Sequence, residues 1–221
     1  MALVTVVLIW LGAYLVASIP FGVVVARLRG VDIRKAGSGN IGATNVGRVL
    51  GRKWGLLVLA LDALKGAMPM LATSWAASHA TIPDWGPATP NLMRLVTGIA
   101  CVAGSIAPIY LGFRGGKAVA TSLGLLLATP HLTFAALIAF VGWAVVRFAS
   151  GYVSLASVVA AILLPIATWG LGCFRGWPLR EEYPLLILTG AVAMIVIVRH
   201  RGNLARLAAG TEPRAGSDRK S

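Results

Sequence analysis

The chain contains little charge, and most of that charge is of one sign. Only 12% of its 221 residues are charged, and 7 Asp and Glu stand against 20 Lys and Arg, for a net charge of +13. Hydrophobic residues make up 57% of the chain, and its mean hydropathy is +0.81. This composition excludes a soluble globular domain and is typical of an integral membrane protein.

Cysteine is scarce as well. Cys101 and Cys173 are far apart and have no partners at metal-ligand spacing, so they fit neither a disulfide framework nor a metal site. We therefore expect no metal and no cofactor. The first apolar stretch begins without a basic segment before it and runs about as far as a bilayer requires, so we expect a retained membrane helix rather than a cleaved signal peptide.

Apolar segments along the chain predict an all-α membrane bundle of about seven helices. They lie at about 3–26, 54–77, 92–112, 118–129, 132–148, 152–173 and 184–198. The fourth is well short of the roughly 20 residues that a full crossing takes, so it is either re-entrant or a broken helix screened from lipid by its neighbours. We expect one membrane domain over 1–221, ending in a charged, flexible tail at 213–221.

The basic residues predict the orientation of this bundle. With the amino terminus outside, the connections 27–53, 113–117 and 147–151 and the tail from Arg199 share one side, which holds 16 of the 20 Lys and Arg. The positive-inside rule places this side, with the carboxyl terminus, in the cytoplasm. The net charge is therefore explained by topology, and nucleic acid is not an expected partner.

Three polar segments on the cytoplasmic side contain residues that topology does not require. The first, AGSGNIGATNVGR at 36–48, combines glycines, short polar side chains and an arginine that can grip phosphate. The second, GFRGGKAVAT at 112–121, sets two glycines and a lysine before the short helix, which favours anion binding by backbone amides although it is not a Walker sequence. The third, RHRGNLARLAAGTE at 199–212, has polar residues three apart, on roughly one helix face. Together they predict one anion-binding pocket at the inner membrane surface.

These segments resemble the three cytoplasmic motifs of the bacterial acyl-phosphate-dependent glycerol-3-phosphate acyltransferases, an integral membrane family. The motifs read here as GSGNIGATNVGR, GGKAVAT and HRGNLARLAAGTE, and the segments LDALKG at 61–66 and GYVSLAS at 151–157 are also similar to family segments. Ala118 departs from the family, which often has glycine there; its methyl group is expected to narrow the second loop. The charged tail after Glu212 lies beyond the last motif.

The resemblance implies an activity and a location. A fatty acyl group would pass from acyl phosphate to the sn-1 hydroxyl of glycerol 3-phosphate, giving lysophosphatidic acid and inorganic phosphate at the bacterial inner membrane, in phospholipid synthesis. The residues agree with this chemistry, because each substrate phosphate carries about 1.5 to 2 negative charges and the motifs supply cations and N–H donors. The acyl chain and membrane lipids would contact the apolar helices.

The site residues follow partly from the family and partly from residue type. By carry-over from the family, the catalytic set is Ser38, Arg48, Lys117, His200 and Asn203, with Gly115 and Gly116 binding the glycerol phosphate. By residue type, further substrate contacts are expected from Gly39, Asn40, Asn45 and Arg206. Glu212 is expected to hold the structure of the tail.

Three other polar positions carry structural as well as functional interpretations. Ser154 can either hydrogen-bond a substrate oxygen or cap a helix. Asp62 and Lys65 lie three residues apart inside a membrane segment, where unpaired charges are costly, so they are expected to pair with each other.

We expect direct acyl transfer without an acyl-enzyme, because the motifs offer no nucleophile, base and orienting group in one set. His200 is a candidate base for the glycerol hydroxyl. Held between two phosphates, however, it is expected to be a charged imidazolium clamp. The departing phosphate would then take the proton of the glycerol hydroxyl.

Two rival functions and one competing motif are weighed against this prediction. A transporter of organic phosphate should show internal repeats and polar residues on both sides of the midplane. This sequence shows no internal repeat, and its polar motifs cluster on one side. A purely structural lipid-binding protein leaves the asparagines unexplained. The stretch HATIPD at 79–84 matches an H-x-x-x-x-D pattern of acyl-CoA-dependent acyltransferases, but it falls in a loop expected to face outside, and we interpret it as coincidence.

Overall fold

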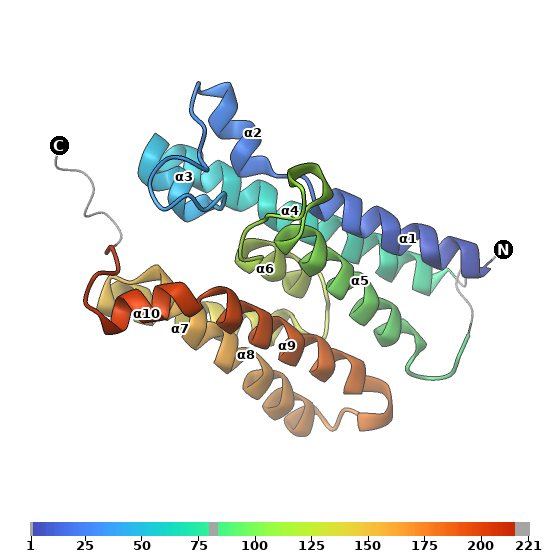
Figure 1. Cartoon of the computed structure of the whole chain (residues 1–221). Helices are drawn as coiled ribbons and strands as arrows, with labels where there is room; N and C mark the ends of the chain where they lie inside the picture. The colour runs from blue at the N-terminus through green and yellow to red at the C-terminus, as the bar shows by residue number, and fades with distance from the viewer. Residues whose placement is uncertain (1, 80–83, 215–221) are drawn as a thin grey trace.

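A computed structural model describes residues 2–79 and 84–214, and in this part of the chain every regular element is a helix (Figure 1). The elements, in order, are α1 (Ala2–Ala17), α2 (Phe21–Leu28), α3 (Ala43–Leu50), α4 (Arg52–Ser78), α5 (Thr89–Ile106), a short 3-10 turn (Ile109–Leu111), α6 (Val119–Leu127), α7 (Thr133–Ser150), α8 (Val153–Arg175), α9 (Leu179–Arg199) and α10 (Arg201–Ala208). The all-α fold class expected from the sequence is confirmed.

Within the described residues, six stretches are long and apolar enough to cross a membrane. They are Leu3–Leu28, Arg52–Ser78, Thr89–Leu111, Thr133–Ser150, Val153–Arg175 and Leu179–Arg199. Helix α6, with nine residues, is too short to cross and corresponds to the predicted short segment 118–129. The chain is thus a multi-pass integral membrane protein built from six long stretches, and α3, α6 and α10 are short helices outside them.

The first apolar stretch is broken, which the sequence pattern did not predict. Helix α1 ends at Ala17 and α2 begins at Phe21, and Figure 1 shows α2 leaving the direction of α1. Pro20 lies in the break as the N-cap of α2, and its missing N–H and its ring disfavour a helix that continues from α1. Lys65 Nζ donates to the carbonyl of Ile19 at 3.1 Å, so a side chain of α4 supplies a donor at the break.

The same lysine forms an ion pair inside the membrane segment. Lys65 Nζ lies 2.8 Å from Asp62 Oδ1, and the Lys65 side chain is only 5% exposed. Because a lone charge in this position would be costly, the pair and the bond to Ile19 together make the lysine tolerable inside the bundle.

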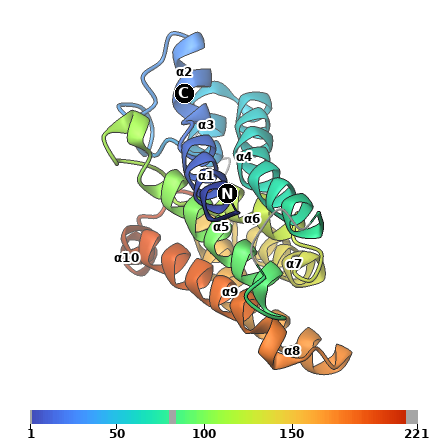
Figure 2. The ribbon, with the colours of Figure 1, turned by 90° about the vertical axis from the view of Figure 1, so that its right-hand side faces the viewer.

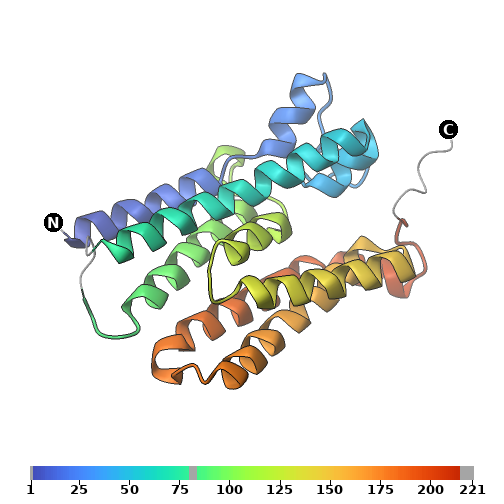
Figure 3. The ribbon, with the colours of Figure 1, turned by 180° about the vertical axis from the view of Figure 1, so that it is seen from behind.

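The long helices form two groups joined by α5. Figures 2 and 3 show α1, α4, α5 and α6 on one side and α7, α8 and α9 on the other. Helix α5 packs against α1, α4 and α9, so it belongs to the first group and also contacts the second. Helix α6 lies between α4, α5 and α7.

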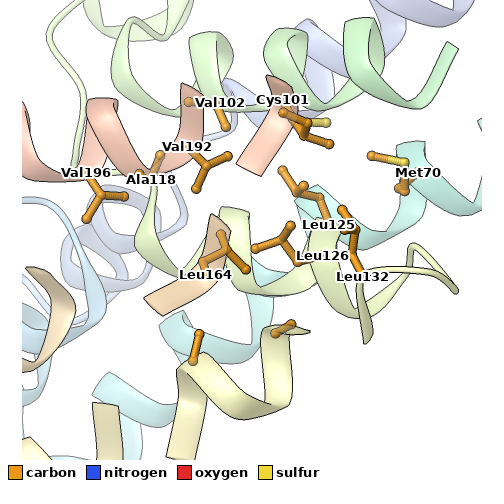
Figure 4. Close-up of a cluster of buried hydrophobic side chains, with 14 of the residues drawn as sticks. Met70, Cys101, Val102, Ala118, Leu125, Leu126, Leu132, Leu164, Val192 and Val196 are labelled. Carbon is orange, nitrogen blue, oxygen red and sulfur yellow. The ribbon is translucent and has the colours of Figure 1, made fainter. Parts of the chain in front are cut away.

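The main hydrophobic core surrounds α6. Leu125 and Leu126 of α6 are 0% and 4% exposed and pack with Met70 of α4, Cys101 of α5 and Leu164 of α8 (Figure 4). Of the two interpretations of this short segment, the structure supports a helix screened from lipid by its neighbours.

Helices α4 and α6 approach each other at a glycine. A Cβ on Gly124 would lie 1.9 Å from the carbonyl oxygen of Ala63, so only glycine allows this backbone contact.

Two predicted segments fall partly outside the described residues. In the tail 213–221, Pro213 and Arg214 follow α10 without regular structure, and 215–221 lie outside the described part of the chain. In HATIPD, residues 80–83 lie outside it too, and His79 follows the last residue of α4.

Candidate active site

The three polar segments meet at one end of the bundle. The second and third are joined by a hydrogen bond of 2.5 Å from Lys117 Nζ to Asn203 Oδ1. The first and second are adjacent because Asn40 Oδ1 would lie 3.9 Å from a Cβ placed on Gly116. Residues far apart in sequence are therefore brought to one place near α3 and α10, at the left of Figure 1.

The loop before α3 is organised by one asparagine. Asn45 is 2% exposed, and its Oδ1 accepts from the Ser38 amide at 2.9 Å. Its Nδ2 donates to the carbonyls of Asn40 at 2.8 Å and Ala36 at 3.0 Å. We expected Asn45 to contact substrate, but both ends of its amide hold the loop backbone.

The other predicted residues of the first motif lie around this asparagine. Ser38 is exposed on the loop, and Gly39 beside it has a φ of +69°. Asn40 Oδ1 accepts from the Gly42 amide at 2.9 Å. Arg48 lies in the last turn of α3 and is half-buried.

The glycine loop before α6 is attached to the end of α5. The amide of Gly115 donates to the carbonyl of Ile106 and that of Gly116 to Ser105, both at 3.1 Å. A Cβ on Gly115 would lie 2.4 Å from both the Ser105 oxygen and Pro108 Cδ, so the loop requires glycine there. We expected these amides to face an anion, but they satisfy the last carbonyls of α5, which have no partners within their own helix.

A residue that sequence reasoning missed holds the other side of this loop. Arg199 Nε donates to the carbonyl of Gly116 at 3.1 Å, and its Nη2 donates to the carbonyls of Gly116 at 2.9 Å and Gly115 at 3.0 Å. A basic residue at the end of a membrane helix is already explained by topology. Its position directly before His200 is the one sequence signal that could have marked it.

Ala118 departs from the family where the backbone suits glycine. Its φ of +59° lies in the left-handed region, which is unfavourable for a residue with a Cβ. The residue is 5% exposed and belongs to the main core (Figure 4), so its methyl group points into protein.

A chain of hydrogen bonds runs from Lys117 into the third motif. Beyond the Lys117 contact, Asn203 Nδ2 donates to Glu212 Oε1 at 2.6 Å. Arg206 Nε donates to Glu212 Oε2 at 2.8 Å. Glu212 therefore fastens the segment after α10 back onto α10 and orients the amide that accepts from Lys117.

The electrostatics of these hydrogen-bonded residues favour an ionised Glu212 and a weakly basic Lys117. Burial lowers the pKa of Lys117 to about 8; the negative charge of Glu212 opposes this effect, while Arg206 and Arg199 add to it. Burial raises the pKa of Glu212, but the hydrogen bonds from Asn203 and Arg206, together with the nearby Ser154 hydroxyl, outweigh this effect and leave the pKa below its usual value.

Ser154 lies close to this carboxylate in the first turn of α8. It is 5% exposed, and its Oγ is near enough to Glu212 to lower the pKa of that carboxyl, although it falls short of a full hydrogen bond. The cap residue of α8 is Tyr152, and no side-chain cap bond forms there. The geometry therefore does not support the helix-cap interpretation of Ser154.

His200 is buried at the junction of α9 and α10. It is 3% exposed, and its Nδ1 lies 2.7 Å from the carbonyl of Val196. Burial, followed by the charge of Lys117, lowers the pKa of His200 to about 4. In the site without phosphate ligands the imidazole is therefore neutral at pH 7, whereas we expected a charged clamp in the loaded enzyme.

An open cleft of about 990 Å³ lies between the first two loops. Its polar lining includes Gly39, Asn40, Gly115, Arg34, Lys35, Arg114 and Arg199. Asp32, also in the lining, pairs with Arg34 at 3.0 Å. The cleft is thus strongly basic. It adjoins the hydrogen-bonded residues Lys117, Asn203 and Glu212 through the loop that Arg199 holds. Residues 2–79 and 84–214 contain no group of three or more His, Cys, Asp or Glu able to hold a metal ion.

Known proteins share both the sequence and the fold. A family model described as glycerol-3-phosphate acyltransferase matches residues 7–210. The glycerol-3-phosphate acyltransferase of Trichlorobacter lovleyi is 40% identical over 208 residues, covering 93% of this chain and 95% of the relative. That of Aquifex aeolicus is 41% identical over 204 residues, covering 91% and 95%.

The fold is also that of solved relatives. The crystal structure of PlsY (YgiH), an integral membrane glycerol 3-phosphate acyltransferase, in its glycerol 3-phosphate form has a TM-score of 0.79 at 38% identity and covers 96% of both chains. Its lysophosphatidic acid form has a TM-score of 0.76 at 38% identity, with 95% of both chains covered.

The sequence and the fold are those of an integral membrane acyltransferase of phospholipid synthesis. The chain belongs to the glycerol-3-phosphate acyltransferase family, which confirms the resemblance seen in the motifs.

Proposed function

We propose that the protein transfers a fatty acyl group from acyl phosphate to the sn-1 hydroxyl of glycerol 3-phosphate, at the cytoplasmic face of the bacterial inner membrane. The products are lysophosphatidic acid and inorganic phosphate. The observation that carries this proposal is the hydrogen bond between Lys117 and Asn203, which joins two motifs beside a basic cleft. Solved relatives in glycerol 3-phosphate and lysophosphatidic acid forms support the acceptor and the product.

Two phosphates require more positive charge than one lysine supplies. The cleft has Arg34, Lys35, Arg114 and Arg199 in its lining, and Lys117 lies beside it. Charge-assisted contacts to these groups would be worth about 1.5–3 kcal/mol each. An acceptor phosphate near Lys117 and a donor phosphate in the cleft would therefore both be held, with the acyl chain directed among the apolar helices.

Individual residues take different parts in this proposal. Lys117 and Asn203 bind substrate oxygen atoms, with Glu212 orienting Asn203. Ser38, exposed on the first loop, and Arg48 complete the catalytic set from that side. Asn45 becomes a positioning residue, because its polar atoms hold the loop that carries Ser38.

The transfer is direct. The glycerol hydroxyl oxygen attacks the acyl carbonyl carbon, a new C–O ester bond forms, and the bond between that carbon and the phosphate oxygen breaks. The departing phosphate takes the hydroxyl proton. Ser38 and Ser154 make no hydrogen bond to a histidine among the described residues, which is consistent with a reaction without a serine nucleophile.

Product analysis tests the proposal. Purified protein given radiolabelled glycerol 3-phosphate should form lysophosphatidic acid with acyl phosphate and not with acyl-CoA. Lys117→Met should lose most of this product, whereas Arg201→Met, which changes an exposed arginine nearby, should keep it. Product from acyl-CoA alone would overturn the proposed donor.

Two further experiments address mechanism and orientation. Radiolabelled acyl phosphate alone, quenched in acid, should leave no hydroxylamine-sensitive acyl group on the protein; a stoichiometric adduct would overturn direct transfer. Single cysteines at Gly39, Arg114 and Asn203, in a chain lacking Cys101 and Cys173, should react with impermeant reagents only from the cytoplasm. Labelling from the periplasm would overturn the orientation.

A further inference from the structure

A second cavity lies at the opposite end of the bundle from the basic cleft. It has a volume of about 440 Å³ and lies between the end of α8 and the start of α9, with Trp169, Cys173, Trp177, Leu185 and Glu182 in its lining. Glu182 and Arg199 are on the same helix, and at 1.5 Å per residue the 17 steps between them span roughly 25 Å. The cavity is therefore separate from the substrate site.

One carboxylate oxygen of this cavity is buried without a partner. Glu182 is 8% exposed, and its Oε1 lies 2.9 Å from His131 Nδ1. Its Oε2 has no hydrogen-bond partner among the described residues. Arg94 is within electrostatic range, but its guanidinium donates to Asn91 Oδ1 at 2.7 Å and to Ser74 Oγ at 3.3 Å. A buried, unpaired carboxylate oxygen is costly, so a cationic donor from outside the chain would be strongly favoured.

The rest of the lining selects what kind of cation can enter. Tryptophan rings attract organic cations through their π faces. Trp177 is already stacked on His131 at 5.0 Å between ring centroids, whereas Trp169, the other tryptophan of the lining, is 55% exposed. A bare divalent metal would need several oxygen ligands, and the lining offers a single carboxylate among apolar groups. An ammonium group on an apolar molecule fits this chemistry.

The surroundings add a place for negative charge. Arg175 lies over the ring of Trp177 at 5.6 Å. Arg180 is exposed in the first turn of α9, where its Nε lies 3.5 Å from Glu181 Oε1, a solvent-exposed pair that leaves its other guanidinium N–H groups to a ligand. The cavity is at the end of two membrane-spanning stretches, where lipid head groups lie and tryptophan is favoured. A membrane lipid whose head carries both an ammonium and a phosphate would satisfy Glu182 and the arginines together.

We propose that this cavity binds the head group of a phospholipid with a primary ammonium, such as phosphatidylethanolamine, with the ammonium donating to Glu182 Oε2 and the phosphate facing Arg175 and Arg180. The lipid acts as a bound structural ligand of α8 and α9 and takes no part in acyl transfer.

Thermal unfolding of the full chain in detergent, with lipids of identical acyl chains added, tests the proposal. Ethanolamine lipid should raise the unfolding midpoint more than choline or glycerol lipid. Glu182→Gln should weaken the apparent affinity for ethanolamine lipid by roughly tenfold or more, the effect expected for loss of one charge-assisted hydrogen bond. Glu181→Gln changes the neighbouring carboxylate and releases Arg180 from its 3.5 Å pair, which should affect the three lipids alike, so the preference for ethanolamine lipid should remain.

Two more variants keep the proposal falsifiable if Glu182→Gln folds poorly. His131→Phe removes the partner of Oε1 but keeps a ring that can stack on Trp177 and leaves Oε2 in place, so it should keep the ethanolamine preference. Cys173→Trp adds bulk at an exposed position of the lining and should abolish the preference while Glu182 remains. Equal shifts with all three lipids, a larger shift with the glycerol lipid, or an unchanged preference in Glu182→Gln or Cys173→Trp would overturn it.

Discussion

Arg199→Met removes a guanidinium that donates to the carbonyls of Gly115 and Gly116 at 2.9–3.1 Å. A charge-assisted hydrogen bond contributes about 1.5–3 kcal/mol, and because Arg199 is exposed we take the lower end for each of the two carbonyls, or about 3 kcal/mol in all. If this energy holds Lys117 in its reactive position, its loss lowers kcat/KM about 100-fold, at about 1.36 kcal/mol per factor of ten.

The assay measures kcat and KM for glycerol 3-phosphate together with the thermal midpoint. Arg201→Met is the matched control, because it removes an exposed arginine two residues away that makes no contact with this loop among the described residues. Arg199→Lys keeps the charge but not the two-pronged donor, so positioning predicts only partial recovery. Wild-type kcat and KM in Arg199→Met would refute the reasoning, and full recovery in Arg199→Lys would show that only charge matters.

Three other predictions concern the same end of the bundle and the membrane ion pair. Because the pKa of Lys117 is about 8 rather than 10.5, its charge is present below pH 8 and lost above it, so kcat/KM should fall through about pH 8, and Lys117→Arg should move this fall upward. Gly115→Ala should destabilise the fold by about 1–3 kcal/mol in thermal unfolding, whereas Gly116→Ala should not, because the nearest atom to its Cβ would be 3.6 Å away rather than 2.4 Å. Lys65→Met should cost about 3–5 kcal/mol by stranding Asp62, and the double variant with Asp62→Leu should cost much less; equal costs would contradict the pairing.

The membrane segments were predictable because each depends on local composition. Long apolar runs must be helices in lipid, whatever their neighbours are. The break after α1 depends on Pro20, which the apolar run concealed. The placement of α6 depends on tertiary contact with α4 at Gly124, which no local pattern reveals.

The meeting of the three motifs was predictable for a different reason. Their charge placed them on one side of the membrane, and their polar residues required a common ligand. The partners of individual groups could not be read in this way. Whether the Gly115 amide faces an anion or the carbonyl of Ile106 depends on where α5 ends beside the loop. Because α5 ends at Ile106, the amide of Gly115 donates to that carbonyl. The role of Arg199 in holding the glycine loop was not predicted, because the positive-inside rule already explained a basic residue at that position.

The protonation state of His200 decides between the clamp and a general base. Nδ1 points at the Val196 carbonyl, so a neutral imidazole donates there and presents Nε2 as an acceptor. The pKa of about 4 in the unliganded site must rise above 6 for a clamp to be charged at pH 6, which requires about 2.7 kcal/mol at about 1.36 kcal/mol per unit. One charge-assisted contact supplies about 1.5–3 kcal/mol, so a single phosphate falls short over most of this range, and two exceed the requirement.

Proton uptake on binding at pH 6 therefore distinguishes the two roles. Lys117 is already charged at this pH, so it contributes no proton uptake. The substrate phosphates titrate in both proteins, so the difference in proton uptake between wild type and His200→Gln reports the imidazole alone. A clamp predicts little extra uptake by the wild type with glycerol 3-phosphate alone and nearly one extra proton when a non-hydrolysable acyl phosphate analogue is added. His200→Gln should then lose substrate affinity along with turnover. If the two proteins take up equal numbers of protons with both ligands bound, and the variant loses turnover alone, the neutral imidazole is the base and the departing phosphate is not.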